Sequence, residues 1–465
     1  MPADRAALAA FRREGRVVVV GASLAGLRAA ETLREEGFTG SITMIGDEPY
    51  EPYDRPPLSK QVLLGRASAD ATALPRHRAI EARWRLGVAA SGLDLAGKRV
   101  LLADGDEVAY DRLLIATGVR ARPWPHESEA ALDGVFLLRT RDDAARLEQR
   151  LSAGPRRVLV IGAGFTGSEI ASACRERGLA VTVVERGAAP LVGALGGVVG
   201  EAAARLQRAY GVDLRCGAMV TGLEGDSGGR LRRAHLSDGT AVDAELAVVS
   251  LGAIRNTEWL VGSGLAAGWR GIACDAACRA FDVQGIVTDD VFVAGDVARS
   301  PHPLFEYQFL SLEHWGNAVA QARTAAHNMV SAGADRRPHV WMPAFWSAQF
   351  GVAVKSVGVP PMGTEFLVAQ GSLTEGRFVG VYGFQGRVIA AVAFDQAKWL
   401  GFYQQLIESA AVFPFDTPGV DPGRDGGRPV PARFPDSSVP THGPTVTLTG
   451  HSPTDQRIAF TPDRP

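Results

Sequence analysis

Two glycine-rich turns are the residues of this sequence whose type and spacing most directly predict chemistry. Each turn places three small residues at the spacing of a dinucleotide-binding loop: Gly21, Ser23 and Gly26 in the first, and Gly162, Gly164 and Gly167 in the second. Small residues let backbone N–H groups approach a pyrophosphate closely, and the start of the following helix adds about half a positive charge. The two turns together predict two bound dinucleotides. Serine at position 23 keeps the first loop small and offers a hydroxyl to the phosphate.

Each turn is followed by a carboxylate at the distance that ribose recognition requires. Asp47 follows the apolar run Ile42–Ile45, and Glu185 follows the run Val181–Val184. A carboxylate at this position accepts hydrogen bonds from ribose hydroxyls and repels a 2′-phosphate. Glu185 therefore predicts NADH in preference to NADPH, although the neighbouring Arg186 is the residue type that serves a 2′-phosphate.

The runs around each turn supply the strand–helix–strand unit that such a turn needs. Val17–Val20 is a β-branched run typical of a buried parallel strand, and Leu27–Glu36 is predicted to be a helix. The second unit repeats this order, with a strand over Val158–Ile161 and a helix over Ala171–Arg177. Two further apolar runs end in small residues: Leu113–Gly118 (LLIATG) and Val291–Asp296 (VFVAGD).

The composition changes after residue 330. Alternating runs within Gly351–Val359 and Phe378–Phe394 predict an antiparallel sheet, and Lys398–Ala410 is predicted to be a closing helix. The segment Pro414–Pro465 holds 11 of the 27 prolines of the chain, together with much glycine and serine. This composition predicts an extended tail with little core of its own.

Length and charge limit the class of protein. The 465 residues are 46% hydrophobic and 22% charged, which is typical of a globular chain with several domains. The net charge of −2 provides no basic field for nucleic acid. No apolar run approaches the roughly 18 residues of a membrane span, and the N-terminus lacks the apolar region of a signal peptide, so we expect a cytoplasmic protein without membrane contact. No His or Cys spacing indicates a metal site.

A resemblance to a known family rests on these motifs together with Arg55–Lys60 (RPPLSK) and Glu313–Asn317 (EHWGN). Over about residues 15 to 410 the chain resembles the FAD-dependent NAD(P)H:ferredoxin reductases, which serve bacterial cytochrome P450 and Rieske oxygenase systems. The resemblance implies a glutathione-reductase-like α/β architecture with two Rossmann-type dinucleotide-binding domains and a C-terminal α+β domain with an antiparallel sheet. The implied ranges are 1–123 and 252–330 for the FAD-binding domain, 124–251 for the NAD(H)-binding domain, 331–413 for the C-terminal domain and 414–465 for the tail.

The resemblance also implies the cofactor sites. The first turn with Asp47 would hold the ADP half of FAD, Asp296 its ribityl and pyrophosphate region, and the second turn NADH. The full set of implied cofactor-binding residues is Gly21, Ala22, Ser23, Ala25, Gly26, Asp47, Arg55, Lys60, Ala116, Thr117, Gly118, Gly162, Gly164, Phe165, Thr166, Gly167, Glu185, Gly252, Gly295, Asp296 and Trp315.

Three residues are implied to be catalytic. Lys60 would lie beside the isoalloxazine, where a cation favours the reduced ring. Glu169 would pair with this lysine and help to place the nicotinamide. Trp315 would lie near the flavin, on the face where the iron–sulfur partner docks.

The implied activity is hydride transfer from NADH to FAD, followed by single-electron transfer to a [2Fe–2S] or [3Fe–4S] ferredoxin that feeds an oxygenase. Because ferredoxins are typically acidic, an arginine patch near the flavin edge is expected to steer docking, with Arg299 and Arg323 as candidates.

Other flavoproteins of this fold need residues that this sequence lacks. A disulfide reductase needs a dithiol beside the flavin, usually C-x-x-C or C-x₄-C, whereas Cys274 and Cys278 are spaced C-x₃-C and precede the VFVAGD run. We interpret these two cysteines as structural. Oxidases and peroxidases of this fold usually carry a cysteine in the flavin segment, and residues 48–66 contain none. An NADH oxidase and an NADH-sensing protein of the apoptosis-inducing-factor-like type remain open as alternatives.

Overall fold

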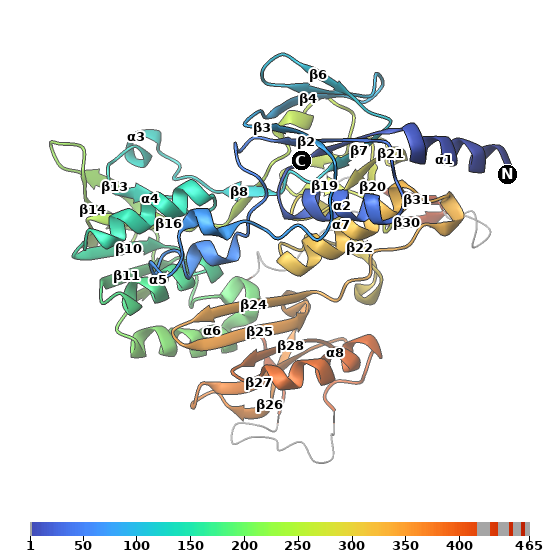
Figure 1. Ribbon diagram of the computed structural model, residues 1–465. Coiled ribbons are helices and arrows are strands. Elements are labelled where there is room, and N and C mark those ends of the chain that lie inside the picture. The colour runs from blue at the N-terminus through green and yellow to red at the C-terminus, as the bar shows by residue number, and fades with distance from the viewer. Residues whose placement is uncertain (1, 416–427, 436–445, 450–456, 461–465) are drawn as a thin grey trace.

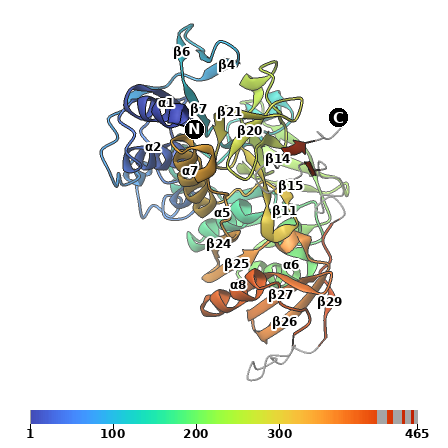
Figure 2. The same cartoon turned by 90° about the vertical axis from the view of Figure 1, so that its right-hand side faces the viewer.

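The computed structural model describes residues 2–415, 428–435, 446–449 and 457–460 (Figure 1). Three sheets organise this part of the chain. Figure 1 shows the sheet of the first dinucleotide unit and the small sheets beside it at the top, the second unit at the left, and the C-terminal sheet at the bottom. The C-terminal sheet is again at the bottom in Figure 2.

The first sheet combines strands from two distant parts of the chain. Its order is β20-β21-β7-β1-β2-β3. The strands are β1 (Arg16–Val20), β2 (Ser41–Gly46), β3 (Arg83–Leu86), β7 (Arg112–Ile115), β20 (Arg279–Phe281) and β21 (Val287–Val293). The central strands β1 and β7 pair in parallel and are almost fully buried, as continuous β-branched and leucine-rich runs should be. The helices α2 (Leu24–Glu35) and α7 (Trp315–Met329) pack against each other and against this sheet.

The second sheet has five strands in the order β12-β11-β10-β16-β9, and each pair is parallel. Its strands are β9 (Val135–Phe136), β10 (Arg157–Ile161), β11 (Ala180–Glu185), β12 (Asp213–Cys216) and β16 (Leu246–Val249). The helices of this unit are α4 (Arg141–Ser152), α5 (Phe165–Glu176) and α6 (Val192–Ala209).

The third sheet is antiparallel, in the order β24-β25-β28-β27-β26-β29. Its strands are β24 (Ala344–Gln349), β25 (Val352–Gly358), β26 (Glu365–Ser372), β27 (Arg377–Phe384), β28 (Arg387–Phe394) and β29 (Val430–Pro431), and α8 (Leu400–Glu408) covers it. The predicted architecture, two Rossmann-type units and an antiparallel C-terminal sheet, is confirmed.

Smaller elements connect and cover these sheets. The remaining helices are α1 (Pro2–Glu14) and α3 (Glu127–Ala130). The remaining strands are β4 (Ala90–Asp94), β5 (Arg99–Leu102), β6 (Glu107–Ala109), β8 (Val119–Ala121), β13 (Val220–Gly225), β14 (Leu231–Leu236), β15 (Ala241–Asp243), β17 (Ala253–Arg255), β18 (Ala267–Gly268), β19 (Gly271–Ala273), β22 (Ala298–His302), β23 (Gln308–Leu310), β30 (Val446–Thr449) and β31 (Arg457–Phe460). Short 3₁₀ turns lie at Pro56–Ser59, Ala69–Thr72, Glu258–Leu260, Pro303–Phe305, Gly333–Asp335, Pro360–Met362 and Ala397–Trp399.

The predicted starts of the two unit helices were too late. Helix α2 begins at Leu24 and α5 at Phe165, so both start inside the glycine-rich turns. Ser23 and Gly164 are their N-caps, so a small residue that looks like a loop residue in the sequence lies directly before the first residue of each helix. The closing helix likewise differs, because Lys398 lies in a 3₁₀ turn before α8.

One described part of the tail packs tightly on the body. Strand β29 pairs with β26 and forms the edge of the C-terminal sheet, and Ala432 is only 2% exposed. The backbone N–H of Gly197 in α6 donates to the carbonyl oxygens of Ala432 and Arg433, both at 3.0 Å. This segment therefore joins the C-terminal sheet to the second dinucleotide unit, which its composition does not predict. The rest of the tail, apart from β30 and β31, lies outside the described residues.

The G196A variant is expected to loosen this contact. Gly196 interrupts α6 with a φ of +73°, and a Cβ there would lie 2.4 Å from the Ala432 carbonyl oxygen. Left-handed strain and the clash should cost about 1–3 kcal/mol of unfolding free energy. Chemical denaturation measures this cost. The matched control is G401A in α8, where no neighbour crowds the Cβ and alanine favours the helix. Equal unfolding free energies for G196A and G401A would contradict the packing seen here.

Among the described residues, no helix is long and apolar enough to cross a membrane. In the same part of the chain no group of His, Cys, Asp and Glu side chains is arranged to hold a metal ion.

Candidate functional site

The two glycine-rich turns have the same backbone geometry. Gly21 has a φ of +119° and Gly162 a φ of +100°, which L side chains rarely adopt. A Cβ on Gly21 would lie 2.1 Å from the Ala116 carbonyl oxygen, and one on Gly162 would lie 2.4 Å from the Ser250 carbonyl oxygen. Each first glycine therefore lets its turn pass directly over the neighbouring strand end.

The remaining motif residues divide between packing and ligand access. A Cβ on Gly26 or Gly167 would lie about 2 Å from the carbonyl oxygen of the first glycine, so these two hold helix and turn together. Gly164 has open space around its Cβ position. No side chain caps the start of α2 or α5, and the Ser23 hydroxyl makes no cap bond. The first N–H groups of both helices are thus left for an anionic ligand.

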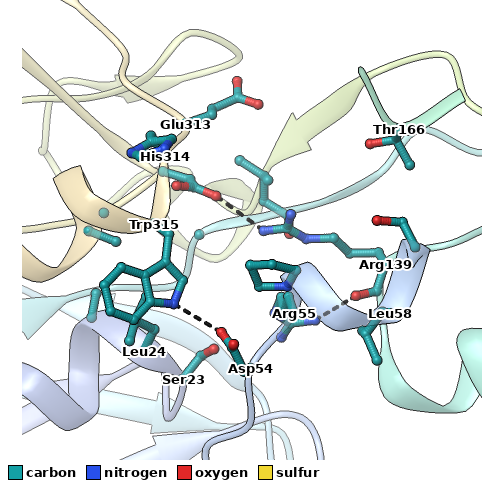
Figure 3. A pocket seen from close by; sticks show the side chains of 18 of the residues that line it. Ser23, Leu24, Asp54, Arg55, Leu58, Arg139, Thr166, Glu313, His314 and Trp315 are labelled. Carbon is teal, nitrogen blue, oxygen red and sulfur yellow. Dashed lines mark hydrogen bonds and ion pairs between the residues drawn. The ribbon is translucent and has the colours of Figure 1, made fainter. Parts of the chain in front are cut away.

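A cavity of about 540 Å³ lies where the first unit, the second unit and the C-terminal sheet meet (Figure 3). It contains the start of α2 at Ser23, the start of α5 at Thr166 and the start of α7 at Trp315. Predicted residues that line it are Ser23, Ala25, Arg55, Lys60, Ala116, Thr117, Gly118, Phe165, Thr166, Glu169, Gly295, Asp296 and Trp315. The residues that line this cavity thus come from positions as far apart in the sequence as 23 and 346.

Lys60 and Glu169, expected to pair, do so in the structure. Lys60 Nζ lies 2.7 Å from Glu169 Oε2, and Glu169 is only 8% exposed. The Ser59 hydroxyl donates to the same oxygen at 2.5 Å. Ser347, from the C-terminal strand β24, donates to the other oxygen, Oε1, at 2.6 Å. The carboxylate is therefore oriented by residues from two distant parts of the chain, Ser59–Lys60 and Ser347.

Trp315 also lines the cavity, at the start of α7. Its indole N–H donates to Asp54 Oδ1 at 2.9 Å, a contact visible in Figure 3. Burial raises the pKa of Asp54, while the indole N–H and the charge of Lys60 oppose that shift. Trp346, which is 40% exposed, contacts Trp315 with ring centroids 6.5 Å apart. These two indoles connect the cavity to the protein surface.

Two arginines form ion pairs at the base of the cavity. Arg139 Nη2 lies 3.1 Å from Asp296 Oδ2. Arg55 pairs with Glu48 at 2.6 Å and donates to the Arg139 carbonyl oxygen at 2.9 Å. Asp296 is therefore held beside the end of β21, with one side facing the cavity.

Glu185 lies at the second turn as its spacing predicts. The backbone N–H of Ala163, inside the turn, donates to Oε2 at 2.7 Å, and that of Gly187 donates to Oε1 at 2.6 Å. The carboxylate is thus fixed at the edge of the loop where a ribose would lie, and Arg186 is exposed.

Not every predicted residue lines the cavity. Asp47 is exposed at the end of β2, where it accepts a hydrogen bond from the Glu48 N–H. The motif residues Gly21, Ala22, Gly26, Gly162, Gly164 and Gly167 build the turns, and Gly252 lies between β16 and β17 with a φ of +84°.

Of the two arginines expected to contribute to a docking patch, one is buried. Arg323 is exposed on α7, but Arg299 is 9% exposed and stacks on Phe309. Arg299 was the wrong candidate, because β22 lies inside a small sheet and its side chains are covered.

The cysteines do not reach the cavity. Cys274 and Cys278 are fully buried, and burial raises the pKa of both thiols well above the ordinary value. All four cysteines are free, and none lines the cavity. The interpretation of this pair as structural fits their positions.

Sequence reasoning missed several residues of the cavity. They are Asp54, Arg139, Glu313, His314 and Phe345. Asp54 adjoins the Arg55–Lys60 motif, and Glu313 and His314 lie inside the Glu313–Asn317 motif, so their positions were a usable signal. Arg139 and Phe345 come from segments without a motif, and only the fold brings them to the site.

His314 caps α7 and is half-buried among aromatic rings. Its Nδ1 accepts a hydrogen bond from the Gly316 N–H at 3.1 Å, and its ring stacks on Trp341 at 5.4 Å. Burial lowers the pKa of His314 to about 4. The ring is therefore neutral, with its proton on Nε2, at physiological pH.

The H314N variant tests this pKa. Between about pH 4 and 6.5 the folded protein holds fewer protons at His314 than the unfolded chain does, so stability falls as the pH falls. Asparagine is a good N-cap but does not titrate. In this pH range H314N is expected to take up about one proton fewer on unfolding than the parent protein does. The pH dependence of the unfolding free energy, measured by denaturation at pH 4.5, 5.5 and 6.5, reports this difference. An unchanged pH dependence would mean that His314 titrates normally in the folded protein.

The site fits FAD and NADH on its own geometry. The starts of α2 and α5 have no side-chain caps and both line the cavity, which is large enough for an aromatic ring system. Asp296 and Thr117 line the first side, and Glu185 stands at the second loop. Lys60 offers a cation in between.

Comparisons with known proteins agree with this geometry. Residues 15–322 match the family described as pyridine nucleotide-disulphide oxidoreductase, and residues 344–419 match the reductase C-terminal family. A probable ferredoxin reductase from Castellaniella defragrans is 36% identical, covering 84% of this chain and 93% of that protein. The ferredoxin–NAD(+) reductase component of an anthranilate 1,2-dioxygenase system from Burkholderia cepacia is 34% identical, covering 85% and 94%.

A solved structure shows the same arrangement. The covalent complex of putidaredoxin reductase with putidaredoxin matches with a TM-score of 0.79 and 29% identity, over 86% of this chain and 94% of that chain. The fold, the cofactor-sized cavity and these matches lead to one conclusion. The chain belongs to the pyridine nucleotide-disulphide oxidoreductases, among the ferredoxin reductases, and its cofactors are FAD and NAD(H).

Proposed function

We propose that this protein transfers electrons from NADH through FAD to a [2Fe–2S] or [3Fe–4S] ferredoxin, which in turn feeds an oxygenase such as a cytochrome P450 or a Rieske enzyme. The observation that carries the proposal is the cavity, which joins a dinucleotide turn, the Lys60–Glu169 pair and an indole that reaches the surface. A cytoplasmic location is part of the proposal, because free buried cysteines suit a reducing compartment.

Lys60 and Glu169 would govern the entry of electrons. FAD, when bound, accepts a hydride from NADH and releases the two electrons singly. Lys60 places a positive charge in the cavity, and Glu169 fixes its direction at 2.7 Å. Glu169 lies on the first turns of α5, one helical turn beyond Phe165, and is therefore placed to position the nicotinamide.

The exit of electrons would use the aromatic residues between cavity and surface. No cysteine lines the cavity, so no thiol relay competes for the electrons. Trp315 and Trp346 lie in contact, and Lys355 is exposed on β25 directly opposite Trp346. A basic residue beside an exposed indole suits an acidic iron–sulfur protein.

Single-turnover electron transfer to a panel of ferredoxins tests the proposal. The NADH-reduced protein is mixed anaerobically with [2Fe–2S] and [3Fe–4S] ferredoxins, and cluster reduction is followed by absorbance. We expect fast reduction of one cluster type, with a second-order rate constant that falls as salt is added. Fast flavin reduction by NADH without transfer to any ferredoxin would instead support an NADH oxidase or an NADH-sensing protein.

The nicotinamide preference gives a further prediction. We expect kcat/KM for NADH to exceed that for NADPH at least about tenfold, since the Glu185 carboxylate at the second loop would repel a 2′-phosphate. In E185Q this ratio should shrink, because the negative charge is lost, while the amide oxygen keeps one of the two hydrogen bonds that the loop N–H groups donate. Steady-state kinetics with both cofactors measures the ratio. Comparable kcat/KM values for the parent protein would mean that Arg186 dominates.

A further inference from the structure

Helix α5 lies along strand β24 and the residue that follows it, Phe350, through three matched contacts. The rings of Phe165 and Phe345 have centroids 3.6 Å apart. One turn further along the helix, Glu169 Oε1 accepts from the Ser347 hydroxyl at 2.6 Å. At the next turn, the Ser172 hydroxyl accepts from the Phe350 N–H at 2.7 Å. The C-terminal sheet is thus in register with the helix that begins at the second dinucleotide turn.

The middle contact reaches the catalytic pair. Glu169 Oε2 receives Lys60 Nζ and the Ser59 hydroxyl, both from the flavin segment. Oε1 receives Ser347, and no second donor reaches it within the described residues. Ser347 is 2% exposed, so water does not replace it readily.

Orientation of a carboxylate needs an anchor on both oxygens. The last torsion of a glutamate is broad and roughly two-fold, so bonds to one oxygen alone leave the group free to swing. A hydroxyl bond to a carboxylate is charge-assisted and stronger than a neutral one. Ser347 therefore removes the remaining freedom of Glu169 and, through it, of the Lys60 ammonium.

We infer that Ser347 is a positioning residue for hydride transfer, through which the C-terminal domain completes the nicotinamide subsite. This inference rests on the roles proposed above for Lys60 and Glu169. It gives the C-terminal sheet a part in the NADH half-reaction, in addition to any part in partner docking.

The test compares S347A, S347T, E169Q and the double variant S347A/E169Q as FAD-loaded proteins. The limiting rate of flavin reduction by NADH, measured by stopped flow, is expected to fall about tenfold in S347A and to recover in S347T, which keeps the hydroxyl. The dissociation constant for NAD⁺, measured by calorimetry on the oxidised protein, is expected to rise about threefold. The control is S356A, which removes an equally buried hydroxyl from the neighbouring strand β25.

The double variant separates positioning from general support. If Ser347 acts through Glu169, S347A/E169Q should reduce flavin within about twofold of E169Q alone. Additive losses, or equal losses in S347A and S356A, would overturn the inference. Neither readout uses a ferredoxin. Failure of ferredoxin reduction in the parent protein would therefore count against the proposed function alone, whereas unchanged flavin reduction and NAD⁺ binding in S347A would count against Ser347 alone.

Discussion

Flavin reduction by NADH is expected to slow about hundredfold in the K60M variant. Lys60 is one of only four lysines in the chain, and its side chain is 20% exposed in the cavity wall. A fixed cation stabilises the negative charge that develops on reduction, and the loss of one such group typically costs about 10²–10³ in rate. Methionine keeps the length of the side chain but leaves the Glu169 carboxylate without its cation. Stopped-flow absorbance at saturating NADH measures the effect.

Two controls make this result specific. K98M removes a different ion-paired lysine, whose partner Asp290 lies on the surface, and should reduce flavin at the parent rate. The double variant K60M/E169Q also removes the buried Glu169 charge that K60M leaves unpaired. It should recover the stability lost in K60M, but not the rate of flavin reduction. Parent-like flavin reduction in K60M would remove Lys60 from the mechanism.

Alanine at the first glycine of each turn is expected to abolish one cofactor site and spare the other. G162A places a Cβ 2.4 Å from the Ser250 carbonyl oxygen, and G21A places one 2.1 Å from the Ala116 carbonyl oxygen. Because both glycines have strongly positive φ, each turn must move, at a cost of about 1–3 kcal/mol in backbone strain alone. G162A should bind FAD normally, but at a fixed low NADH concentration its flavin should be reduced at least about hundredfold more slowly than in the parent protein. G21A should be purified largely without FAD.

The two variants check each other. FAD content is read from the visible absorbance of the purified proteins, and NADH use from stopped flow after FAD is added back. G164A is a milder control, because its Cβ meets no protein atom within 4 Å and should disturb only the approach of the ligand. If G162A lost FAD and G21A kept it, the assignment of the turns would be reversed.

Local patterns were sufficient to predict the dinucleotide units. A β-branched run, three small residues and a helix occupy one continuous stretch, and their geometry follows from short-range sterics and hydrogen bonding. Glu185 could be placed for the same reason, since its position at the end of β11 fixes where its carboxylate lies. The helix starts were missed by a few residues because the N-caps are themselves part of the turns.

Contacts between distant segments could not be predicted in this way. Ser347 and Glu169 are separated by 178 positions, and Trp315 and Asp54 by 261. The local sequence around one residue of such a pair does not identify the other residue, because the pairing depends on how the three sheets pack together. Arg299 failed as a surface candidate for the same reason, since the sequence does not show that β22 is covered. The packed segment around Ala432 lies in a proline-rich stretch whose composition alone indicates a loose tail.

NADH-driven reduction of cytochrome c, with and without an added ferredoxin, tests the central proposal most directly. The protein alone should reduce cytochrome c slowly, and the correct ferredoxin should stimulate the rate strongly, because electrons leave the cavity through a docked iron–sulfur protein. The stimulation should disappear when NADH is omitted. Rapid flavin reduction by NADH with no stimulation by any [2Fe–2S] or [3Fe–4S] ferredoxin would contradict the proposed electron transfer.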